Sequence, residues 1–180
     1  MTLLFSIILI VGALSRFVPH PANFAAIGAL GIFAGLYAKN WKQALFLPIS
    51  ARLVSDLLIG FFSPGVMISV YLSTAIGAML GVLAKRNKNI LTVGSATIAS
   101  AIIFFILTNF AVWQFDHIYP VNLPGLLESY TMALPFFRNS LLGDLFYTGV
   151  LVGGYEAFLY VKCKMLNVKT TVKNLKPTTK

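Results

Sequence analysis

Charged side chains inside otherwise apolar segments are the first candidates for chemistry in this sequence. Arg52 and Asp56 are four residues apart, a spacing that places both on one face of a helix. Because a charge in an apolar environment is costly, such residues are expected to serve a function or to neutralise one another. A structural ion pair and a ligand site are therefore both open for this pair, and in either case the side chains should point inward.

A second group of polar residues surrounds Asp144. Arg138 and Asn139 precede it, and Tyr147 follows three residues later on the same helical face. Arg138 could equally be an anchor at a membrane interface. Asp144 is deeper in its apolar run, which makes it the stronger candidate for a binding role.

Two turns contribute the remaining candidates. Asn109 and Trp113 are four residues apart near the end of an apolar run. For Trp113 alone, a place in an interfacial aromatic belt is the favoured interpretation. Arg16, His20 and Asn23 surround a proline-rich turn, where one of them could be only a helix cap. We therefore include all five as candidate ligand-binding residues.

The composition predicts an integral membrane protein. Of the 180 residues, 58% are hydrophobic and 11% are charged, whereas soluble domains carry about 25% charged residues. The first apolar stretch has no basic leader and no small-residue cleavage site, so we expect it to be retained as a helix. The single cysteine, Cys163, excludes an internal disulfide and a cysteine-based metal site.

Apolar runs between charged breaks predict a bundle of six transmembrane helices, over 2–18, 24–38, 43–61, 65–84, 90–115 and 138–161. These would form one all-α domain over 1–164. The basic clusters follow the second, fourth and sixth helices: Lys39 and Lys42, then Lys85, Arg86 and Lys88, then Lys162, Lys164 and the tail lysines. The positive-inside rule then predicts that both termini are cytoplasmic. It also accounts for the net charge of +9 without a nucleic-acid partner.

The longest outer connection runs from Asp116 to Phe137 and contains no Lys or Arg. Within it, the amphipathic stretch 123–134 is predicted to form a short helix that lies over the outer mouth as a lid. The basic tail, 165–180, is predicted to be disordered. This topology places the polar candidates in the middle or outer half of the bundle, where apolar walls with a few polar groups predict a small-molecule pocket. Six side chains should converge there: Arg52, Asp56, Asn109, Trp113, Arg138 and Asp144.

Small residues recur at the spacing of close helix contacts. The pairs are Ala25 and Ala29, Gly31 and Gly35, Gly77 and Gly81, and Gly149 and Gly153. Packing within the bundle is the favoured interpretation for any one pair, and contact with a partner protein is the other.

Motifs of enzymes are missing from the sequence. It has no Gly-rich phosphate loop, no His-Glu-x-x-His and no Gly-x-Ser-x-Gly. The two histidines, His20 and His117, fall in outer loops and with Asp116 are weak evidence for a metal site. We therefore expect a protein that is not an enzyme and has no metal.

Four motifs support a family resemblance that covers the chain to about Lys162. They are SRFVPHPANF over 15–24, SDLLIGF over 55–61, TNFAVW over 108–113 and LPFFRNSLLGDL over 134–145. The sequence resembles the substrate-binding S components of energy-coupling-factor (ECF) vitamin transporters, and more closely a set of small bacterial membrane proteins that look like solitary S components.

The resemblance implies a subunit of the bacterial inner membrane that binds a vitamin or a similar scarce nutrient near the outer face. Its partners would be an ECF coupling subunit and ATPases, and Ala25 and Ala29 could dock on that coupling subunit. Some solitary S components are linked to cobalamin and use a cysteine near the outer pocket. Here the only cysteine, Cys163, is at the predicted cytoplasmic end of the last helix, away from the outer pocket. His20 or His117 could meet the cobalt instead.

Three interpretations follow from these observations. The leading one is nutrient uptake, in which the bundle carries the ligand across the membrane with the help of a partner. The second is a scaffold subunit of a membrane complex, in which the polar residues only hold helices together. The third is a small intramembrane enzyme.

Overall fold

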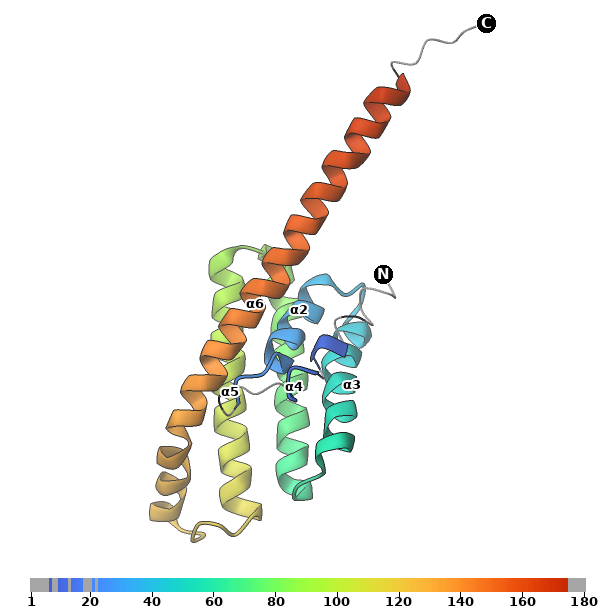
Figure 1. Ribbon diagram of the computed structural model, residues 1–180. Helices are drawn as coiled ribbons and strands as arrows, with labels where there is room; N and C mark the ends of the chain where they lie inside the picture. Colours follow the sequence, from blue (N-terminus) through green and yellow to red (C-terminus); the bar gives the residue numbers. More distant parts are fainter. Residues whose placement is uncertain (1–6, 8–9, 13, 18–20, 22, 175–180) are drawn as a thin grey trace, which may run out of the picture.

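The computed structural model describes residues 7, 10–12, 14–17, 21 and 23–174, with side chains to Met165 (Figure 1). Within this part the chain is helical and contains no strand, as the sequence predicted. The elements are α2 (Ile27–Tyr37), α3 (Trp41–Ile59), α4 (Pro64–Ala84), the 3₁₀ turn η1 (Lys85–Asn87), α5 (Ile90–Phe115) and α6 (Leu123–Asn174). The first predicted helix, 2–18, lies mostly outside the described residues.

Capping residues in the sequence explain where several helices begin. Asn40 accepts a hydrogen bond from the backbone N–H of Gln43 at 2.9 Å, and Asn89 accepts one from Thr92 at 2.8 Å. Each satisfies an N–H group that has no partner inside its helix. Pro64 opens α4, where its missing N–H costs nothing. As a result, α5 spans the predicted range, and α3 and α4 begin within two residues of the prediction.

The short helix α2 forms the centre of the bundle. Nine of its eleven residues are buried, and it contacts α3, α4, α5 and α6. At 1.5 Å per residue it is about 16 Å long, so its first residue lies inside the bundle rather than at its end. The chain enters it through Asn23, whose positive φ of 65° is tolerated by asparagine.

Glycines bring α2 and α4 into close contact. A Cβ atom at Gly81 would stand 2.5 Å from the carbonyl oxygen of Ile32, and one at Gly35 would overlap the backbone of α4. Gly31 and Gly77 lie in the same contact region. Packing within the bundle is therefore confirmed for the pairs Gly31–Gly35 and Gly77–Gly81. Gly149 and Gly153 on α6 are different, since a Cβ at either would have nothing within 4 Å.

The helix α6 corrects two predictions. It runs without interruption from Leu123 to Asn174, with Pro135 inside it, and projects beyond the other helices at its C-terminal end (Figure 1). The segment 123–134 is therefore the first part of α6 and not a separate lid helix. The tail predicted to be disordered from 165 is helical as far as Asn174. Packing of the first turns against α5, where the Tyr130 hydroxyl donates to the Ile106 carbonyl oxygen at 2.9 Å, holds the segment in line.

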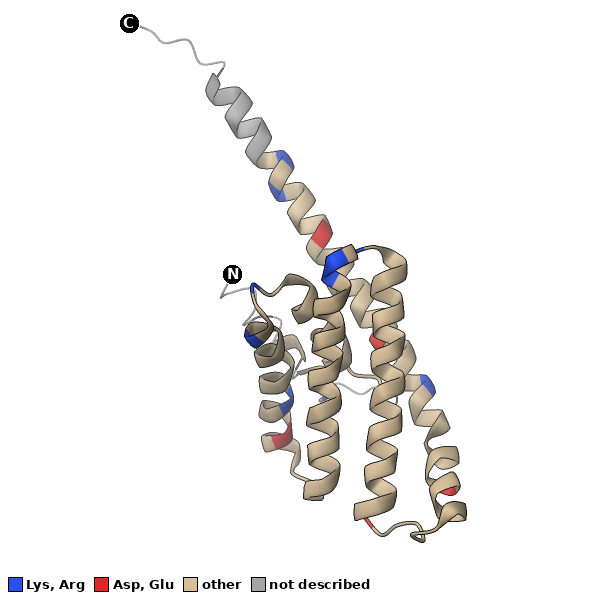
Figure 2. Ribbon diagram, turned by 180° about the vertical axis from the view of Figure 1, so that it is seen from behind, with Lys and Arg blue, Asp and Glu red and all other residues tan. Residues whose placement is uncertain are grey.

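In the part of the chain that the structure describes, two helices are long and apolar enough to cross a membrane, by length and composition alone. They are the segments 64–87 and 90–115, which comprise α4 with η1 and α5. The turn between them carries Lys85, Arg86 and Lys88, and the opposite end of the bundle carries Asp116 and Glu128 (Figure 2). Lys85 donates to the carbonyl oxygen of Ala38 at 2.6 Å, and Lys88 pairs with Glu156 of α6. This basic end is therefore tied to both α2 and α6.

Candidate functional site

A cavity of about 490 Å³ lies among α2 to α6. It is lined by the N-terminal part of α4, the C-terminal part of α5 and the early part of α6, so it occupies the half of the bundle away from the basic turn. Its walls are largely apolar and aromatic: Ile27, Ile59, Phe62, Val66, Val70, Phe104, Phe105, Val112, Phe136 and Phe137. The rings of Phe105 and Phe137 pack at 4.7 Å between centroids and close one side.

Arg52 supplies a cation to this cavity from α3. Its guanidinium carbon stands 5.7 Å from the centre of the Phe104 ring, within the range of a cation–π interaction. Its Nε atom is buried and has no hydrogen-bond partner among the described residues. A buried donor without a partner costs free energy, and an acceptor atom of a ligand would remove that cost.

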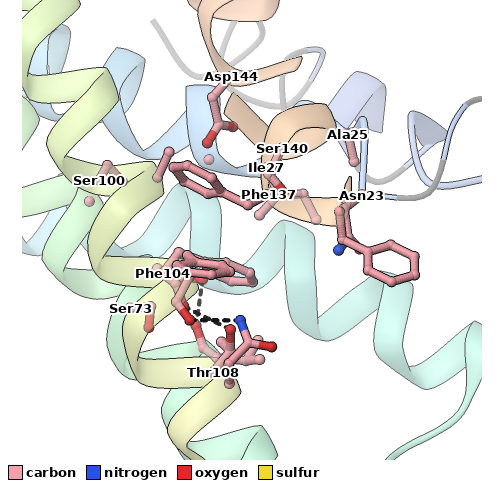
Figure 3. Close-up of a pocket in the computed structure, with 18 of the residues that line it drawn as sticks. Asn23, Ala25, Ile27, Ser73, Ser100, Phe104, Thr108, Phe137, Ser140 and Asp144 are labelled. Atoms are coloured by element: carbon pink, nitrogen blue, oxygen red, sulfur yellow. Dashed lines mark hydrogen bonds between the residues drawn. The ribbon is translucent and has the colours of Figure 1, made fainter. Parts of the chain in front are cut away.

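Asp144 supplies a carboxyl group from α6. Its carboxyl group is directly against Gly28 and accepts a hydrogen bond from the backbone N–H of Ala29. Ala29 is in the first turn of α2, where N–H groups have no partner within the helix. Asp144 therefore caps α2 from another helix, and Ser15 adds a second cap by accepting from the N–H of Ala26 at 3.1 Å. Figure 3 shows the Asp144 carboxyl group directed toward Phe137, with Phe104 and Thr108 farther along the cavity.

Small polar side chains complete the lining. Thr74 and Thr108 donate to carbonyl oxygens one turn earlier in their own helices, at 2.8 and 2.7 Å. Asn109 donates to the carbonyl oxygen of Phe105 at 2.7 Å. Each of these side chains therefore keeps acceptor capacity for another group. Ser73, Ser100 and Ser140 also line the cavity.

Asp56 belongs to a different polar cluster. It is fully buried, forms an ion pair with Arg16 and accepts a hydrogen bond from the Tyr71 hydroxyl at 2.9 Å. Arg16 also donates to the Ser55 hydroxyl at 2.6 Å. Every carboxylate oxygen of Asp56 thus has a partner, and the residue does not line the cavity. The structural interpretation of Asp56 is supported, and Arg52, one turn earlier, is the cavity residue.

The predicted convergence is therefore correct for half of its members. Arg52, Asn109 and Asp144 line the cavity, together with Arg16 and Asn23, whereas Asp56, Trp113 and Arg138 do not. Trp113 donates to the carbonyl oxygen of Pro120 at 2.9 Å and ties α5 to the following turn, and Arg138 is exposed. Asn139 is outside the lining, and Tyr147 packs against Phe24 instead, at 5.7 Å between ring centroids. His20 lies outside the described residues.

The docking role predicted for Ala25 and Ala29 conflicts with the position of Ala29. Ala29 is fully buried in the centre of the bundle, and Ala25 precedes α2 and lines the cavity. Ala29 presents no surface to a partner, because α2 is covered by four other helices. Ala25 is only partly buried, and its docking role stays a prediction.

The hydroxyl groups and phenylalanines of the cavity were missed from the sequence. Serine, threonine and phenylalanine are common inside apolar helices, so singly they give no signal. Their spacing does: Ser100, Phe104 and Thr108 recur every four residues on one face of α5. In the described part of the chain, no three His, Cys, Asp or Glu side chains gather as metal ligands would.

Together, fold and site define a protein whose described residues are all-helical, with two candidate membrane-spanning helices among them and a mostly apolar cavity between the helices. The chain belongs to DUF6580, a family of unknown function, whose model matches residues 1–166. The comparison with curated proteins found no match, and neither did the comparison with solved structures.

Proposed function

We propose that this protein is a membrane-embedded binding subunit for the uptake of a small nutrient such as a vitamin. The observation that carries the proposal is the cavity, whose volume of about 490 Å³ falls in the range of about 300–1,000 Å³ that is usual for small-molecule sites. Apolar walls with few polar groups are also typical of such sites.

A membrane location is supported by the apolar side chains on the outside of the bundle. Leu58 on α3 is 70% exposed and Ile68 on α4 is 69% exposed, and many neighbours on the same helices are similar. Soluble monomers rarely expose such continuous apolar surface. We propose six crossings of the bacterial inner membrane with both termini in the cytoplasm. In this arrangement α2 covers only about half of a bilayer core of about 30 Å.

The resemblance to ECF S components supports a role in transport through a partner that hydrolyses ATP. Since Ala29 is fully buried and Ala25 lines the cavity, a coupling subunit would bind a surface other than this pair. Cobalamin is a macrocycle with a nucleotide arm and is larger than the cavity, so the volume favours a smaller nutrient.

The test is a thermal-shift experiment on the purified protein with a panel of vitamins. A ligand present at 100 times its Kd should stabilise the protein by about 2.7 kcal/mol. The matched variants are Ala101→Phe, which fills the cavity, and Ala99→Phe, which places the same ring on α5 outside the cavity lining. Loss of the shift only in Ala101→Phe would support the proposal. If no compound stabilises the wild-type protein, the proposal is wrong.

A scaffold subunit is the second candidate, and the Asp56 cluster favours it. Its hydrogen bonds join Arg16, α3 and α4 and give both carboxylate oxygens of Asp56 a partner within the protein. A scaffold would show no ligand-induced stabilisation and would co-purify with a membrane complex.

A further inference from the structure

Two side chains of the cavity lining that can carry opposite charges, Arg52 and Asp144, have no ion-pair partner in the described part of the chain. Among the described residues, ion pairs join Arg16 to Asp56 and Lys88 to Glu156, and none joins Arg52 to Asp144. Both Arg52 and Asp144 nevertheless line the same cavity. The Nε of Arg52 lacks an acceptor, and the one bond given to Asp144 comes from a backbone N–H.

The remaining charges around the cavity cancel. Arg16 lines it but is neutralised by Asp56, which leaves one basic side chain, Arg52, and one acidic side chain, Asp144, facing the space. A ligand with a net charge would leave one of these two groups facing a like charge or no charge. In a mostly apolar cavity that arrangement is costly, because unpaired charges are poorly screened there.

We infer that the ligand is a net-neutral compound that presents an acceptor to Arg52 beside a donor to Asp144, on an aromatic or apolar body. This inference rests on the proposed function. A neutral ring with an amide-type edge has this chemistry, and so does a zwitterionic amino acid with an apolar side chain. The rings of Phe104, Phe105 and Phe137 supply the contact for the body. A ligand bound to both Arg52 and Asp144 in this way satisfies the buried donor of Arg52 and leaves the total charge of the cavity unchanged.

Three compounds with one pyridine ring separate the charge classes. Nicotinamide has the neutral donor–acceptor edge, nicotinate has only an anion, and 3-(aminomethyl)pyridine has only a cation. Phenylalanine represents the zwitterionic source. Each is titrated at millimolar concentration against the purified protein in lipid nanodiscs, and its affinity is measured by equilibrium dialysis alongside the vitamin panel.

The wild-type protein should bind nicotinamide or phenylalanine about tenfold more tightly than nicotinate and 3-(aminomethyl)pyridine, since a buried group left without its partner costs about one factor of ten in affinity. Whichever of nicotinamide and phenylalanine binds more tightly shows whether the ligand is a neutral ring with an amide-type edge or a zwitterionic amino acid. Asp144→Asn should shift the preference toward nicotinate, and Arg52→Gln should shift it toward 3-(aminomethyl)pyridine. The two variants are independent, so failure of one to fold leaves the other as a test.

The possible outcomes separate the inference from the proposed function. Tightest binding of a charged compound by the wild-type protein, or unchanged preference in a folded Asp144→Asn variant, overturns the inference and leaves a binding subunit in place. If no compound of either set binds, the proposed function fails and the inference fails with it.

Discussion

The carboxyl group of Asp144 occupies the space where Gly28 lacks a side chain: a Cβ atom at Gly28 would stand 2.6 Å from the Asp144 Cγ. The two residues belong to α6 and α2, which are far apart in the sequence. Their contact lets one carboxylate cap the buried start of α2 and face the cavity at the same time.

Replacing Gly28 with alanine should therefore destabilise the protein. The added methyl group would displace the Asp144 carboxyl group and break its bond to Ala29, at a cost of about 1–3 kcal/mol. The measurement is the melting temperature in mild detergent. Gly94→Ala is the control, because nothing lies within 4 Å of a Cβ there and alanine is better than glycine in a helix by about 0.5–1 kcal/mol. Equal melting temperatures for the two variants would contradict the proposed contact.

The α2–α4 contact predicts that alanine at Gly35 lowers stability more than alanine at Gly28. A Cβ there would overlap the backbone of Ala78 and Gly81, which cannot move aside as a side chain can. We expect Gly35→Ala to lower stability by about 3 kcal/mol or to prevent recovery of a monodisperse protein, as judged by size-exclusion chromatography. Gly149→Ala, in open space on α6, should not lower stability and should raise it by at most about 1 kcal/mol. A well-folded Gly35→Ala variant with an unchanged melting temperature would show that α2 and α4 are farther apart.

The two ion pairs should differ in their contribution to stability. Asp56 is fully buried, so Asp56→Asn leaves Arg16 without its counter-charge, and breaking a buried pair costs about 3–5 kcal/mol. The Lys88–Glu156 pair is about 40% exposed, and Glu156→Gln should cost about 1 kcal/mol or less. Thermal unfolding of both variants measures the difference.

The double variant Arg16→Met with Asp56→Leu tests the cause of that loss. Removing both charges leaves no unpaired ion, so this protein should be more stable than Asp56→Asn alone. If the double variant is the less stable of the two, packing rather than charge explains the effect of Asp56→Asn.

Cys163 allows the proposed topology to be tested. It is the only cysteine of the chain and is exposed on α6 beyond the basic turn. A membrane-impermeant maleimide should modify it in inside-out vesicles and not in intact cells. In a Cys163→Ser background, Val121→Cys, in the exposed loop at the other end, should show the reverse. Modification of Cys163 in intact cells would refute a cytoplasmic C-terminus.

Local signals in the sequence were sufficient to predict most of the described helices. Asn40, Asn89 and Pro64 mark helix starts because their side chains or ring act on backbone groups within three residues. The glycine pairs of α2 and α4 were also readable, because a helix places residues four apart on one face. The amphipathic stretch 123–134 was misread as a separate lid helix because its pattern is local, whereas packing against α5 keeps it in line with the rest of α6 through Pro135.

The sequence by itself determined which polar residues had to avoid lipid and that Arg52 and Asp56 share a helical face. It did not determine their roles. Asp56 is neutralised because Arg16, forty residues earlier, and Tyr71 on α4 reach it, whereas Arg52 lines the same cavity as Asp144. Periodicity describes the neighbours of a residue along one helix. Which side chains meet across helices depends on how the helices pack, and that was decided only by the tertiary structure.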